Sequence, residues 1–259
     1  MTGRCPCGAN YFPVFFASIL VISIFTSFAI AVAQSDISPW FPAISDTATK
    51  SPESNIFSQL VNISTFIGLI LIYVRYLQVK RDVEWLEGNQ TTLLLNRHSL
   101  PVGLIAVLGC SIVANFPETQ VLIVHLIGAT MLFVFGNIYV WFQVIISFHM
   151  KKMGLINSCV NIMRLIFAVL STISFVITFV MVSIASKKKS GAKLHWHSNE
   201  PGYMEHVIGD AFEWLMVFSF LLVFLTFTKE LQQSRLQFRL VGNESSYDPV
   251  PSQSEHIEV

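Results

Sequence analysis

Three ionisable side chains, His206, Asp210 and Glu213, are the part of the sequence best suited to chemistry. Their spacing of four and then three residues places all three on one face of a helix. His125 lies near the beginning of another apolar segment. An imidazole held beside carboxylates can exchange protons, bind a metal ion or act as a general base. We therefore treat His125, His206, Asp210 and Glu213 as one candidate cluster.

Three interpretations of this cluster remain open. In a structural role, Glu213 pairs with His125 or with a loop lysine and orients the helices. In a sensing role, the imidazoles titrate near the pH of an acidic compartment. In a catalytic role, the imidazole and carboxyl groups bind a metal or act as a general base on a lipid. The sequence contains no compact metal motif such as His-Glu-x-x-His, so we predict no metal and no other cofactor.

The elements that position these residues must lie in a membrane. Hydrophobic residues make up 53% of the chain and charged residues 12%, and the mean hydropathy is +0.60. A soluble domain would carry about 25% charged residues. Six apolar runs approach the ~20 residues that a helix needs to cross a bilayer. They are residues 14–33, 56–76, 100–116, 121–148, 156–185 and 207–228. Backbone groups in lipid must pair within their own segment, so we predict an all-α membrane domain of six helices over residues 1–233.

The distribution of positive charge predicts the sidedness of these helices. Most of the 16 lysines and arginines fall in segments on the same side as the two termini, which places both termini in the cytosol. The candidate cluster then lies at the exterior, or lumenal, end of the helices. Ala31-Val32-Ala33 resembles a signal-peptide cleavage site. The run before it, however, exceeds the ~7–15 residues of a usual signal core, so we expect the first helix to be retained.

Several polar and small residues inside the apolar runs also need an explanation. Arg164, at the start of the fifth run, is expected to extend toward the cytosolic head groups, with a site for an anionic lipid as the alternative. Asn115 and Asn137 are expected to form hydrogen bonds between helices. Small residues let helices approach closely, which we expect of the glycines in the third and fourth runs. These are Gly103, Gly109, Gly128 and Gly136.

Several stretches in the right order carry a family resemblance. The first exterior loop contains Pro42-Ala43-Ile44-Ser45-Asp46-Thr47 and then Pro52-Glu53, and the second run ends in Tyr73-Val74-Arg75-Tyr76. The fourth run contains His125-Leu126-Ile127-Gly128, and the last loop contains Lys193-Leu194-His195-Trp196. The chain resembles the damage-regulated autophagy modulator (DRAM) family, within the Frag/DRAM/Sfk group of six-span proteins. Its signature falls on Ser45, Asp46, Thr47, Pro52 and Glu53.

The resemblance implies a multi-pass protein of the lysosomal or late endosomal membrane that promotes autophagy and, in some members, cell death. It implies no catalytic residue, so we expect a protein that is not an enzyme and whose partners include membrane lipids. One alternative is an intramembrane lipid-modifying enzyme that uses the lumenal cluster, because a related branch takes part in remodelling GPI anchors. A second alternative is a pH-sensing transporter of ions or small molecules.

Residues 234–259 differ in character, being polar and proline-bearing, and predict a disordered cytosolic tail. Within it, Tyr247-Asp248-Pro249-Val250 fits the tyrosine-x-x-apolar signal that clathrin adaptors bind, with Tyr247 and Val250 as the anchors. The final Ile257-Glu258-Val259 could instead add a strand to a PDZ-type domain. The net charge of zero argues against a nucleic-acid partner.

Overall fold

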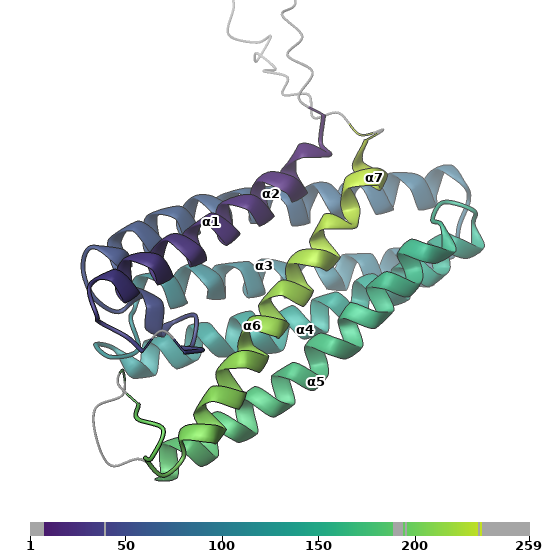
Figure 1. Ribbon diagram of the computed structural model, residues 1–259. Helices are drawn as coiled ribbons and strands as arrows, with labels where there is room; N and C mark the ends of the chain where they lie inside the picture. Colours follow the sequence, from purple (N-terminus) through teal and green to yellow (C-terminus); the bar gives the residue numbers. More distant parts are fainter. Residues whose placement is uncertain (1–7, 39, 189–193, 195, 233, 235–259) are drawn as a thin grey trace, which may run out of the picture.

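The computed structural model describes residues 8–38, 40–188, 194, 196–232 and 234 (Figure 1). These residues form helices and no strand. The helices are α1 (Tyr11–Ala33), η1 (Asp46–Ala48), α2 (Glu53–Trp85), α3 (Gln90–Asn115), α4 (Leu122–Lys152), α5 (Ser158–Lys188), α6 (Tyr203–Leu225) and α7 (Phe227–Leu231). Six helical stretches, with α6 and α7 counted together, are long and apolar enough to cross a membrane. The prediction of an all-α, six-span membrane protein is confirmed.

The helices run further than the apolar runs that predicted them. Helix α2 continues to Trp85 and α3 begins at Gln90, so residues 77–99, expected as a loop, are largely helical. Hydrogen bonds within a helix do not stop at the membrane boundary, and charged residues such as Lys80 and Glu84 are well exposed there. The start of α3 is fixed by Asn89, whose side chain accepts a hydrogen bond from the Thr91 N–H at 2.9 Å.

The two ends of the described chain lie together. The Ala9 N–H donates a hydrogen bond to the Ser234 carbonyl oxygen at 3.1 Å. We call this end of the bundle the chain-end side, and the opposite end, which carries the α1–α2 and α5–α6 loops, the loop side (Figure 1). The cytosolic assignment of the chain-end side stays a prediction.

Helices α5 and α6 form a hairpin that lies obliquely across α1–α4 (Figure 1). Side-chain hydrogen bonds join α5 to α4 along the half of α4 nearer the chain-end side. They link Ser147 to Asn161 (2.6 Å), Trp141 to Thr172 (3.0 Å) and Asn137 to Ser171 (3.0 Å). Toward the loop side the hairpin diverges from α4. The α5–α6 hairpin therefore lies at an angle to the α1–α4 layer, and we call the region between them the wedge.

The layer itself is closely packed, most of all between α3 and α4. A methyl group added at Gly109 would lie 2.6 Å from the Leu132 backbone nitrogen and 2.7 Å from the Gly128 carbonyl oxygen. The two backbones can approach this closely only because Gly109 has no side chain. Gly128 is fitted against α3 in the same way, with Val113 N at 2.9 Å from the added atom. The expected close approach at these two glycines is confirmed.

Candidate functional site

The wedge between the hairpin and the layer contains a cavity of about 630 Å³. This volume falls within the ~300–1,000 Å³ typical of small-molecule sites. All six long helices contribute to its largely apolar wall. The lining includes Phe16 of α1, Val61 of α2, Val107 of α3, Leu132 of α4, Phe179 of α5 and Phe220 of α6. A space of this size and chemistry suits a hydrocarbon chain.

The cavity has a polar end toward the loop side and lining residues with large exposed surface on α4 and α5. The polar end is lined by Ser45, Glu118, His125, Lys187 and Glu213. Two other lining residues, Leu126 of α4 and Phe179 of α5, have large exposed fractions, 52% and 67% respectively. From these exposed fractions we infer that the cavity opens where α4 and α5 diverge.

The α1–α2 loop folds back onto α6 and closes the loop side. The Ile44 N–H donates to Glu213 Oε1 at 3.1 Å, and the Trp214 indole N–H donates to the Pro42 carbonyl oxygen at 2.8 Å. Among the described residues, Glu213 forms no ion pair with His125 or with a lysine, and the loop lysines Lys189 and Lys193 lie outside the described residues. His125 instead contacts the Phe116 carbonyl oxygen through Nδ1, at 2.8 Å. A backbone N–H reaches Glu213 because the loop packs directly over it.

The family-signature residues build this same loop. Thr47, fully buried in η1, forms a hydrogen bond of 2.9 Å with Ser27 of α1, and Ser45 lines the cavity. Pro52 precedes the first residue of α2, Glu53. Glu53 is completely buried, and neither of its carboxylate oxygens has a hydrogen-bond partner among the described residues. Its position in the first turn places the carboxylate at the positive end of the helix dipole, which favours a negative charge.

His206 and Asp210 form a second group, separate from the contacts of Glu213 and His125. His206 Nδ1 lies 3.2 Å from Asp210 Oδ2, and the Trp196 ring stacks on the imidazole with 4.3 Å between centroids. Ligand atoms of Asp46, His206 and Asp210 lie within 4.8 Å of one another, so this donor set could accept a divalent cation. Direct contact between His206 and Asp210 also accounts for their proximity without a metal.

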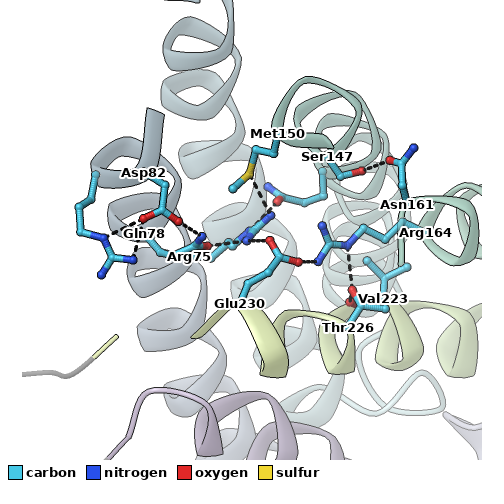
Figure 2. A network of polar contacts seen from close by, with 12 residues as sticks. Arg75, Gln78, Asp82, Ser147, Met150, Asn161, Arg164, Val223, Thr226 and Glu230 are labelled. Atoms are coloured by element: carbon cyan, nitrogen blue, oxygen red, sulfur yellow. Dashed lines mark hydrogen bonds and ion pairs between the residues drawn. The ribbon is translucent and has the colours of Figure 1, made fainter. Parts of the chain in front are cut away.

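A buried ionic network lies at the opposite, chain-end side (Figure 2). Glu230 of α7 lies between two arginines, Arg75 of α2 and Arg164 of α5, and forms an ion pair with each. The Arg75 Nη1 to Glu230 Oε2 distance is 2.5 Å. Both guanidinium groups are fully buried and rest on the Phe227 ring, at 4.7 and 4.9 Å from its centroid.

The expectation that Arg164 extends to the head groups is thus wrong, because α7 brings a carboxylate to it. Arg164 also donates through Nε to Thr226 Oγ1 at 2.8 Å. Arg75 donates to Gln143 Oε1 at 3.1 Å and to Gln78 Oε1 at 2.5 Å. The network ties α2, α4 and α5 to the α6–α7 segment, and we interpret it as structural. Sequence reasoning missed Glu230, although two arginines near apolar runs signalled a need for a buried acid.

A profile described as the Frag1/DRAM/Sfk1/Cwh43P N-terminal domain matches residues 8–234. The chain belongs to this family. DNA damage-regulated autophagy modulator protein 2 of Rattus norvegicus is 34% identical over 248 residues, covering 92% of this chain and 91% of its own. DNA damage-regulated autophagy modulator protein 1 of Homo sapiens is 35% identical over 216 residues, covering 82% and 86%.

A third relative of the chain is Modulator of macroautophagy TMEM150B of Xenopus tropicalis. It is 36% identical over 128 residues, which cover 47% of this chain and 53% of the relative. No solved structure gives a significant match. The family match includes all six spans, the cavity and the ionic network. The predicted tail signals, Tyr247 to Val250 and Ile257 to Val259, lie outside both the family match and the described residues. Lys193 and His195 lie within the family match but outside the described residues.

Proposed function

We propose that this protein resides in the lysosomal or late endosomal membrane and promotes autophagy through lipid and protein partners, without catalysing a reaction. The observation that carries the proposal is similarity along nearly the whole chain to proteins named as autophagy modulators. TMEM150B, which matches a shorter part of the chain, is also named as a modulator of macroautophagy. The fold agrees with a membrane role, because its six long helices surround a largely apolar cavity of about 630 Å³.

The autophagy role is tested by measuring flux, the rate at which autophagosome cargo is degraded in lysosomes. Expression of this chain in cells that lack their own autophagy modulators of this family should raise flux above that of empty-vector cells. The difference should disappear when lysosomal proteases are inhibited. Unchanged flux at a verified expression level would count against the proposal.

The tail supplies the lysosomal part of the proposal, with Tyr247 and Val250 as an adaptor signal and the last three residues as a candidate PDZ ligand. Replacing Tyr247 with alanine removes the aromatic anchor, so a large share of the protein should move to the cell surface. Surface biotinylation and co-staining with a lysosomal marker measure the shift. Ser252→Ala, outside the tetrapeptide, is the matched control. A Tyr247→Ala protein that stays in lysosomes would remove the sorting signal from the proposal.

A lipid-modifying enzyme is a second candidate, favoured by one observation. Glu213 and His125, an acid and an imidazole, both line the polar end of a cavity that could hold a lipid chain. Such an enzyme would release lipid products when purified protein is mixed with vesicles, and Glu213→Gln would abolish the release without lowering the folded yield. Absence of any new product by lipid mass spectrometry would exclude this candidate.

A further inference from the structure

The polar end of the cavity contains a carboxylate that no cation of the described residues pairs with. Glu213 is partly buried and accepts the Ile44 N–H, and no lysine, arginine or histidine of the described chain pairs with it. Removing a charge from water is costly unless an opposite charge or hydrogen-bond donors compensate for it. A ligand that brings an ammonium group to Glu213 would supply that compensation.

A cation without a described partner lines the same end. Lys187 is exposed in the last turn of α5, and no carboxylate of the described residues pairs with it, whereas its neighbour Lys188 pairs with Glu205 at 2.5 Å. Lysine is a common binding partner for phosphate groups. The cavity end thus presents one site for a cation and one for an anion, next to an apolar volume.

These three features match the three parts of one kind of molecule. An acyl chain fits the apolar cavity, and it can enter between α4 and α5, where Leu126 and Phe179 line the opening. A zwitterionic head group supplies the phosphate and the ammonium. A primary ammonium carries three N–H donors for a carboxylate, whereas the trimethylated ammonium of phosphatidylcholine carries none.

We propose that the cavity binds one phosphatidylethanolamine molecule. One acyl chain occupies the cavity, the phosphate contacts Lys187, and the primary ammonium donates hydrogen bonds to Glu213. The second acyl chain stays in the bilayer outside the α4–α5 opening. This site does not depend on the autophagy role, because binding is a property of the purified protein and is measured without cells.

The test uses purified full-length protein and native mass spectrometry with lipids added at equal concentration. The lipids are phosphatidylethanolamine, its mono- and dimethylated forms, and phosphatidylcholine, all with the same chains. Affinity should fall with each methyl group, to a total of about tenfold or more, which corresponds to at least ~1.4 kcal/mol. Equal affinity across the series would overturn recognition of the ammonium by hydrogen bonds, whatever the behaviour of any variant.

Variants locate the site. Glu213→Gln retains an amide oxygen for the Ile44 N–H, and it should lower phosphatidylethanolamine affinity to the phosphatidylcholine level while leaving phosphatidylcholine unchanged. Glu205→Gln, on the same helix but outside the cavity lining, should change neither. Lys187→Ala should weaken both lipids and phosphatidylglycerol, since all three carry the phosphate.

Ala129→Trp fills the cavity from α4 and should abolish retention of every lipid. Size-exclusion profiles identify the variants that fold, and only these are compared. Full retention by a folded Ala129→Trp protein would show that lipid binds elsewhere and would overturn the proposal.

Discussion

Replacement of Glu230 by glutamine should lower the free energy of unfolding by about 3–5 kcal/mol, the range found when one partner of a buried ion pair is removed. Glu230 is the acid between two completely buried arginines, Arg75 and Arg164. Glutamine is similar in size, so the packing changes little. Two like charges then remain inside the bundle without a carboxylate between them. Loss of helical circular dichroism during titration of mixed micelles with sodium dodecyl sulfate measures the change.

Two further variants distinguish charge balance from simple loss of contacts. Arg164→Met leaves a balanced pair, Arg75 and Glu230, so it should cost clearly less than Glu230→Gln, although it removes both hydrogen bonds that Arg164 donates, to Thr226 and to Glu230. Glu84→Gln breaks the half-exposed pair with Lys80, whose charged atoms lie 3.9 Å apart, and should change stability by less than about 1 kcal/mol. Equal losses for Glu230→Gln and Arg164→Met would contradict the charge argument.

Gly109→Ala should also destabilise the protein strongly, by roughly 1–3 kcal/mol, the cost of adding a methyl group to a well-packed interior. Alanine favours helices over glycine by up to ~1 kcal/mol, so the expected loss opposes the intrinsic preference. The added methyl would meet backbone atoms of α4 at 2.6 and 2.7 Å, and backbone cannot rotate away. The same detergent titration measures the loss of stability, which we attribute to weaker packing between α3 and α4.

Gly136→Ala is the matched control, since this glycine also lies in a transmembrane helix. The nearest atom to its added methyl belongs to the Phe220 ring, at 3.1 Å, and a side chain can shift. We expect a smaller loss than at Gly109. A stability of Gly109→Ala equal to that of the unchanged protein would show that α3 and α4 can separate without cost.

The spans were predictable from the sequence because hydropathy is a local property of about 20 consecutive residues. The hydrogen bonds expected of Asn115 and Asn137 were also predictable, since amides in lipid need partners. Asn115 bonds to Asn62 of α2 at 3.0 Å, and Asn137 accepts from Ser171 of α5. The need of these two amides for hydrogen-bond partners could therefore be predicted, although the partners themselves could not.

The partners themselves depend on how the helices are arranged, which hydropathy does not determine. Glu230 lies just beyond the last apolar run, residues 207–228, yet the turn at Thr226 carries it between two arginines. Glu213 was grouped with His206 and Asp210 by helical spacing alone. The fold instead places Glu213 on the cavity and His206 with Asp210 and Asp46. The reason is a loop distant in sequence, residues 42–47, which packs on α6 and forms hydrogen bonds with Glu213 and Trp214.

The hydrogen bond between Ala9 and Ser234 has a practical meaning for experiments on the living cell. The seven residues before Gly8 and the long C-terminal extension begin at neighbouring points on the bundle. A reporter fused at residue 1 is therefore attached at the same end of the bundle as the predicted sorting signal of the tail. Trafficking of a protein labelled at its amino terminus should be compared with that of one carrying only a short epitope.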